Sequence, residues 1–169
     1  MRLPKVLFVC LGNICRSPLA EGIFRHQIAL QAPEHPVIVD SAGLDDYHVG
    51  EPPDARTLLV AHQHGITLNH RARLITPEDF QRFDYILAMD RSNLRKLQKL
   101  ARQYAIADPP EIRLMRDFDP QPDGGEVPDP YYGTMEDFEA VYQILDRSIR
   151  HFIDFLLNSV VRSESPQHR

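Results

Sequence analysis

Short apolar runs alternate along the chain with longer segments whose apolar residues recur every three or four positions. Four apolar runs have the length of buried strands: residues 5–9, 37–40, 85–89 and 112–115. Three segments between them have helical length and spacing: residues 19–31, 55–64 and 93–104. Alternating strands and helices predict a parallel sheet with helices on both faces. Ligands of such sheets bind beyond the carboxyl ends of the strands.

The clearest helical pattern begins near residue 134 and continues to the end of the apolar sequence. Thr134 is the predicted N-cap, and the apolar positions that follow form one stripe, which we interpret as core packing. We expect residues 1–161 to form a single domain. Residues 162–169 contain little that could be buried, so we expect them to form a mobile tail.

Residues 10–17 (CLGNICRS) join the first predicted strand to the first predicted helix. Ser17 suits the N-cap, and Pro18 suits the first helical position. Gly12 and Asn13 tolerate the left-handed backbone that turns N–H groups inward. Inward N–H groups at a helix N-terminus form an anion cradle, and Arg16 adds a fork of donors that matches two phosphate oxygens. The segment therefore predicts a phosphate site.

Cys10 lies at the start of this cradle. The N–H dipoles, Arg16 and the helix N-terminus favour its thiolate form, and a Ser17 hydroxyl donating to the sulfur would stabilise the thiolate further. A lone cysteine in this position would more simply be a buried residue at the end of a strand. Six adjacent residues that each supply a separate part of one mechanism favour the catalytic interpretation.

A second group of candidate residues precedes the last helix. Residues 117–130 are rich in Asp, Pro and Gly and have no periodicity, and a loop of that length is usually functional. If Cys10 attacks a phosphoester, the leaving oxygen needs a proton, which Asp129 can donate and later recover from water. Tyr131 and Tyr132 offer aromatic walls for a flat substrate group.

Composition restricts the remaining classes of function. The chain has 169 residues, 43% of them hydrophobic and 25% charged, as in a globular domain of ordinary size. A net charge of −5 without a basic patch argues against nucleic acid as a partner. The apolar stretches are too short for a membrane span, the amino end shows no signal peptide, and two cysteines in one loop fit a reducing cytoplasm. His62 and His64 have no further ligand at metal-binding spacing, and we interpret them as solvated surface.

The chain resembles the low-molecular-weight protein tyrosine phosphatases over residues 4–157. The strongest anchors are residues 9–18 (VCLGNICRSP) and residues 129–133 (DPYYG). Four shorter segments also match: residues 40–43 (DSAG), 64–66 (HGI), 70–73 (HRAR) and 89–94 (MDRSNL). Two catalytic motifs in this order and at this separation make the resemblance specific.

The resemblance implies a three-layer α/β fold, with a four-stranded parallel twisted sheet, helices on both faces and the phosphate-binding loop after the first strand. It implies hydrolysis of phosphotyrosine, and of small aryl phosphates, through a phosphocysteine intermediate and without a metal or other cofactor. By position, Cys10 would be the nucleophile, Arg16 the phosphate clamp and Asp129 the general acid and then base. The other implied site residues are Leu11, Gly12, Asn13, Ile14, Cys15 and Ser17 in the loop, Ser41 and His70 as its support, and Tyr47, Tyr131 and Tyr132 in the substrate cleft.

The expected partners are a phosphotyrosine protein or peptide as substrate and inorganic phosphate as product and inhibitor. We expect a cytoplasmic monomer that binds neither nucleic acid nor membrane. Cys15 is either an apolar filler or a resolving thiol that pairs with oxidised Cys10.

Three alternative functions remain. Arsenate reductases on the same fold need cysteines beyond Cys10 and Cys15, which the chain lacks. Phosphoarginine phosphatases of the same family tend to carry Thr where Ile14 stands and lack the paired tyrosines. A binding module without turnover would have lost a catalytic group, whereas Cys10, Arg16 and Asp129 are all present.

Overall fold

The described residues form a sheet of four parallel strands, as the sequence predicts. The structure shows their order to be β2-β1-β3-β4. The computed structural model describes residues 2–121 and 123–164, with side chains described up to residue 160. The strands are β1 (Val6–Cys10), β2 (Val39–Gly43), β3 (Tyr85–Ala88) and β4 (Glu111–Leu114). All five residues of β1 are buried, which explains why this central strand reads as an unbroken apolar run.

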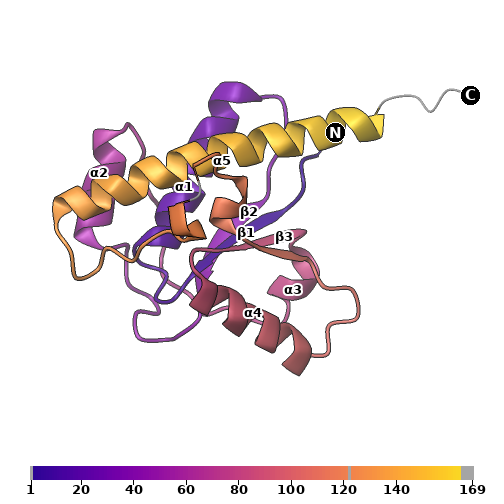
Figure 1. The fold of residues 1–169 in the computed structure, drawn as a ribbon, viewed down its shortest axis with the longest axis horizontal. Coiled ribbons are helices and arrows are strands. Elements are labelled where there is room, and N and C mark those ends of the chain that lie inside the picture. Colours follow the sequence, from indigo (N-terminus) through magenta and orange to yellow (C-terminus); the bar gives the residue numbers. More distant parts are fainter. Residues whose placement is uncertain (1, 122, 165–169) are drawn as a thin grey trace, which may run out of the picture.

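Helices cover both faces of the sheet and complete the predicted three layers (Figure 1). One face carries α1 (Arg16–Gln31), α2 (Ala55–Gln63) and α5 (Met135–Glu164), and the other carries α3 (Asp79–Arg82) and α4 (Arg91–Gln103). Alternate residues of β1 divide between the two cores: Val6 and Phe8 pack toward α1 and α5, and Leu7 and Val9 toward α3 and α4. The four-residue α3 was not predicted, because it is too short to show a helical period.

The long helix α5 lies across the molecule against α1 and α2 (Figure 1). It begins directly after Thr134, whose N–H donates to Asp137 Oδ2 at 2.8 Å. It ends at Glu164, three residues into the segment expected to be a tail, and residues 165–169 of that segment lie outside the described residues. None of the helices in the described part of the chain is long and apolar enough to cross a membrane.

The carboxyl ends of the strands gather the candidate residues at one edge of the sheet. Cys10 ends β1, Gly43 ends β2, and Asp90 follows β3 as the N-cap of α4. After β4 the chain forms two short 3-10 turns, η1 (Met115–Phe118) and η2 (Asp123–Gly125), before it reaches Asp129. This edge is where a parallel α/β sheet places its ligand.

Candidate active site

The loop between β1 and α1 is held in shape by the side chain of Asn13. Asn13 has the left-handed backbone that the sequence suggested, with φ of 58°. Its Nδ2 donates to Ser17 Oγ at 2.8 Å and to Ser41 Oγ at 3.1 Å. Its Oδ1 accepts from His70 Nε2 at 2.7 Å and from the Arg73 N–H at 3.0 Å. The loop thus depends on one buried side chain that connects α1, β2 and the chain around residue 70.

Two details of this loop differ from the sequence predictions. The first helix starts at Arg16 with Cys15 as its N-cap, so Ser17 lies inside the first turn and does not cap it. Its hydroxyl instead lies 3.0 Å from Cys10 Sγ. Gly12 does not have a positive φ. Its lack of a side chain allows the His48 ring to approach, because a Cβ there would lie 3.1 Å from His48 Cδ2.

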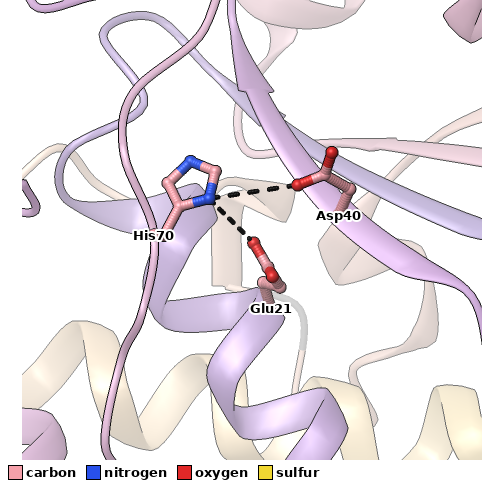
Figure 2. Close-up of side chains that lie close together, drawn as sticks. All are labelled: Glu21, Asp40 and His70. Carbon is pink, nitrogen blue, oxygen red and sulfur yellow. Dashed lines mark ion pairs between the residues drawn. The ribbon is translucent and has the colours of Figure 1, made fainter. Parts of the chain in front are cut away.

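Behind the loop, His70 lies between two carboxylates (Figure 2). Its Nδ1 is 3.4 Å from Glu21 Oε1 on α1 and 3.9 Å from Asp40 Oδ1 on β2. Burial lowers the pKa of His70, whereas the charges of Glu21 and Asp40 act in the opposite direction. Nε2 carries one proton, because it donates to Asn13 Oδ1. The ring is charged only when Nδ1, which faces Glu21 and Asp40, carries a second proton.

The Glu21, Asp40 and His70 side chains lie close enough together to hold a metal ion. Both carboxylates already have partners within the protein. Glu21 accepts a hydrogen bond from Ser41 Oγ, and Asp40 accepts hydrogen bonds from Arg73 Nε and from the Ser41 N–H. We therefore interpret the cluster as support for the phosphate loop. Neither Glu21 nor Asp40 was singled out from the sequence as a support residue, because nothing in the local pattern connects them to His70.

Cys10 and Arg16 lie at the base of a cleft of about 230 Å³. Both side chains are buried, at 3% exposure each. Arg16 Nη1 donates to Asp90 Oδ2 at 2.8 Å and to the Val127 carbonyl at 3.0 Å. Burial alone would lower the pKa of Arg16, but the negative charges of Cys10, Asp90 and Asp129 raise it above its usual value. The guanidinium is therefore held in place and always charged, as a phosphate clamp requires.

Asp129 faces Arg16 across this cleft. Its Oδ2 is 3.7 Å from Arg16 Nη2, and its Oδ1 accepts from the Tyr131 N–H at 3.1 Å. The Asp129 side chain is 47% exposed, so solvent and a bound ligand can both reach it. The three proposed catalytic groups therefore meet in one cleft, although Asp129 is more than 100 residues away from Cys10 and Arg16 in the sequence.

Aromatic and apolar side chains form the walls of the cleft. The structure places the predicted cleft residues Tyr47, Tyr131 and Tyr132 around it, together with Leu11 and Ile14 of the phosphate loop. It adds Asp45 and His48. Asn13, Ser17, Ser41 and His70 do not line the cleft but lie behind the loop. A narrow cleft with an anion cradle at its base and rings at its mouth suits a phosphate carried on a flat group.

The segment that carries Tyr131 is anchored by Arg56, a residue that no local sequence pattern indicates. Its Nη2 donates to the Tyr131 carbonyl at 2.9 Å and its Nη1 to the Gly133 carbonyl at 3.2 Å. Asp54, the N-cap of α2, holds the Arg56 guanidinium in turn. Arg56 comes from the second helix, so only the tertiary structure could reveal this contact.

Cys15 lies beside the catalytic loop as a buried free thiol. Burial, together with the nearby charges of Asp54 and Cys10, raises its pKa to about 12. In the reduced protein Cys15 is therefore a neutral thiol at physiological pH, so it does not compete with Cys10 for the phosphorus atom.

His64 is not the solvated residue that the sequence suggested. Its ring stacks on Tyr142 at a centroid distance of 3.6 Å, and its Nε2 lies 2.9 Å from Glu139 Oε1. The ring thus joins the end of α2 to α5. The neighbouring His62 is exposed, as predicted.

Comparison with known proteins agrees with this geometry. A sequence model described as "low molecular weight phosphotyrosine protein phosphatase" matches residues 5–164. The human protein of that name is 48% identical over 149 residues, which cover 88% of this chain and 93% of that protein.

Two solved structures have the same fold. An arginine phosphatase of Drosophila is 38% identical, with a TM-score of 0.85 over 89% of this chain and 96% of its own. A protein tyrosine phosphatase of Entamoeba histolytica is also 38% identical, with a TM-score of 0.84 over 92% of this chain and 98% of its own. The chain therefore belongs to the low molecular weight phosphotyrosine protein phosphatase family and is a protein tyrosine phosphatase.

Proposed function

We propose that the chain hydrolyses phosphotyrosine in proteins or peptides by two successive phosphoryl transfers at Cys10. The observation that carries the proposal is the meeting of Cys10, Arg16 and Asp129 in one cleft with aromatic walls. The reaction needs no group beyond these side chains and water.

In the first transfer the Cys10 thiolate attacks phosphorus, forming the S–P bond as the bond to the tyrosyl oxygen breaks. Asp129 donates its proton to that oxygen, which leaves as a neutral phenol; a positioned general acid typically contributes about 10²–10⁴-fold to the rate. The Arg16 fork and the loop N–H groups hold the phosphoryl oxygens while charge develops on them.

In the second transfer the Asp129 carboxylate takes a proton from water, whose oxygen attacks phosphorus. The S–P bond breaks, phosphate is released and Cys10 leaves as thiolate. The Ser17 hydroxyl, 3.0 Å from Cys10 Sγ, can donate to that thiolate and make it a better leaving group. Inorganic phosphate occupies the same cradle, so we expect it to inhibit as a product.

Hydrolysis of p-nitrophenyl phosphate tests these roles. We expect no turnover by Cys10→Ser and a large loss by Asp129→Ala that becomes smaller as the leaving group becomes more acidic. Asp46→Ala is a matched control, because Asp46 is an exposed carboxylate of the loop after β2. Full activity of Cys10→Ser would refute the mechanism.

A second candidate substrate is phosphoarginine, because the arginine phosphatase of Drosophila has a closely similar fold. Ile14 and the paired Tyr131 and Tyr132 favour an aromatic ester, whose ring they can pack against. Two peptides of one sequence, carrying either phosphotyrosine or phosphoarginine, separate the candidates by kcat/KM. A higher value for phosphoarginine would assign the chain to the second class.

We also propose that Cys15 acts as a resolving thiol after oxidation. Hydrogen peroxide would convert the Cys10 thiolate to a sulfenic acid; the Cys15 sulfur would then attack the Cys10 sulfur, forming S–S, breaking S–O and releasing water. Support comes from their place in one short loop, where both are buried free thiols that line the same cleft. Peptide mass analysis after peroxide treatment tests this, and only sulfinic and sulfonic acids on Cys10 would exclude the role.

We propose the cytoplasm as the working compartment. Both cysteines are free, and the reaction requires Cys10 to stay reduced, which a reducing compartment ensures. Fractionation of cells that produce the protein, with activity measured in each fraction, tests this assignment. Recovery of the activity from an oxidising compartment would contradict it.

A further inference from the structure

A buried network of charges lies between the end of β4 and α5, outside the cleft. Asp119, whose side chain is fully buried, accepts from Arg116 Nε at 2.9 Å. It also accepts from Arg147 on α5, through Nε at 2.7 Å and Nη2 at 2.9 Å. Burying a carboxylate this deeply is unfavourable unless it is fully paired, so Asp119 fixes both arginines.

The free side of Arg116 is directed at the loop that leads to Asp129. Nη1 donates to the carbonyls of Asp123 at 3.0 Å and Glu126 at 2.9 Å, and Nη2 donates to the carbonyl of Gln121. One guanidinium thus bonds three carbonyls of an irregular segment. Lysine could not replace it, because a single ammonium cannot donate to acceptors that lie in four directions.

The segment held by Arg116 continues directly into the active site. Val127, one residue after Glu126, is fully buried; its N–H donates to the Met89 carbonyl at 2.8 Å and its carbonyl accepts from Arg16 at 3.0 Å. Asp129 follows two residues later. The half-exposed Asp129 side chain depends on this backbone for its position, because its own contacts are the Tyr131 N–H and the distant edge of Arg16.

We propose that Arg116 is a positioning residue for the general acid. It holds the backbone of residues 121–127, apart from the undescribed residue 122, so that Asp129 meets the leaving oxygen at the correct distance. The inference rests on the proposed function, in which Asp129 protonates that oxygen. Arg116 touches neither substrate nor Cys10, so it acts through Asp129.

A positioning role has a kinetic signature that loss of stability does not have. A misplaced acid slows the expulsion of a basic leaving group more than that of an acidic one. Partial unfolding lowers the amount of active enzyme and slows all substrates equally. The dependence of kcat/KM on the leaving group therefore separates the two roles.

The experiment measures kcat/KM for phenyl phosphate and p-nitrophenyl phosphate with the parent and with Arg116→Lys. We expect a loss of about tenfold or more for phenyl phosphate and of less than about threefold for p-nitrophenyl phosphate. Arg113→Lys is the matched control: this half-exposed arginine of β4 pairs with Asp117 on the surface and does not contact the loop before Asp129. It should leave both values unchanged.

Two further variants test the same positioning role. Combined with Asp129→Ala, Arg116→Lys should add little further selectivity, because the acid that it positions is gone. If Arg116→Lys does not fold, Arg147→Gln weakens the same network from its more exposed end. It should lower kcat/KM for phenyl phosphate more than for p-nitrophenyl phosphate, by a smaller factor than Arg116→Lys would. Equal losses for the two substrates, or no loss, would overturn the inference.

The outcome also separates this inference from the proposed function. If Asp129→Ala shows no selectivity for the leaving group, the proposed mechanism itself fails. If Asp129→Ala is selective and neither Arg116→Lys nor Arg147→Gln is, only the positioning role fails.

Discussion

Replacing Asn13 by glycine should damage both the stability of the protein and its phosphate site. Glycine can adopt the positive φ of this position, so the variant isolates the loss of the side chain. The side chain makes four hydrogen bonds: to Ser17, Ser41 and His70 and to the backbone N–H of Arg73. All of them lie beneath the loop that would cradle the phosphate.

The size of the effect follows from these bonds. Each contributes about 0.5–1.5 kcal/mol net. Ser17 and Ser41 keep other partners, Cys10 and Glu21, so the sum falls toward its lower end, about 2–3 kcal/mol. The greater freedom of glycine in the unfolded chain adds about 0.5–1 kcal/mol. We therefore expect Asn13→Gly to lower the free energy of unfolding by about 3 kcal/mol.

Urea denaturation measures this loss, and inhibition by inorganic phosphate reports on the cradle. We expect the inhibition constant for phosphate to rise about tenfold, which corresponds to about 1.4 kcal/mol of lost binding. Ala105 provides a control, since it also has a positive φ, of 52°, but is exposed and at the end of α4. Ala105→Gly relieves the backbone strain and should stabilise the protein by up to about 1 kcal/mol.

The reasoning would be refuted if Asn13→Gly unfolded within about 1 kcal/mol of the parent and bound phosphate equally well. That result would mean that the loop holds its shape through its backbone alone. Asn13→Ala should lower the free energy of unfolding by the same amount as Asn13→Gly, to within about 1 kcal/mol. Alanine is strained at a positive φ, and this strain is similar in size to the cost of ordering glycine on folding.

Three further substitutions or treatments test other parts of the structure. Gly43→Ala would place a Cβ 3.0 Å from the Leu11 carbonyl and should weaken phosphate inhibition; unchanged inhibition would show that the loop can move aside. Iodoacetamide at neutral pH should alkylate Cys10 and leave Cys15 unmodified, because the Cys15 pKa is about 12; equal labelling in peptide mass spectra would contradict that value. Burial raises the pKa of Asp119, but its hydrogen bonds from Arg147, the Gln121 N–H and Arg116 outweigh burial and lower it. Asp119→Asn should therefore lower the free energy of unfolding by about 3–5 kcal/mol, as measured by urea denaturation at neutral pH. The difference in the free energy of unfolding between parent and variant should shrink only below about pH 4, as the pH falls through the lowered pKa of Asp119 in the folded protein. A difference that stays constant below about pH 4 would count against the ion pairs.

The features predicted from the sequence are those that neighbouring residues encode together. The apolar runs indicated the four strands to within a few residues, most clearly for β1, because this central strand is buried on both faces. Cys10, Asn13 and Arg16 share one loop, so their spacing alone suggested a phosphate site. Asp129 could be added because a long loop without periodicity ends there.

The features that the sequence did not reveal depend on residues brought together by folding. Asp90 and the Val127 carbonyl fix Arg16, and Arg56 anchors the chain after Asp129, yet none of these contacts has a local pattern. The indications for Asp90 were its place after a strand, at the edge where ligands bind, and its position in the segment 89–94 that matches the family. The N-cap assignment of Ser17 was wrong for a related reason: its hydroxyl lies against Cys10, and the helix begins one residue before it.

The most direct test of the proposed mechanism is to trap the intermediate. Asp129→Ala is mixed with p-nitrophenyl phosphate, quenched in acid within the first turnover and digested, and the peptides are analysed by mass spectrometry. The mechanism predicts that the peptide containing Cys10 gains one phosphoryl group and that Cys10→Ser,Asp129→Ala gains none. Rapid release of p-nitrophenol with no phosphoryl group on Cys10 would contradict it.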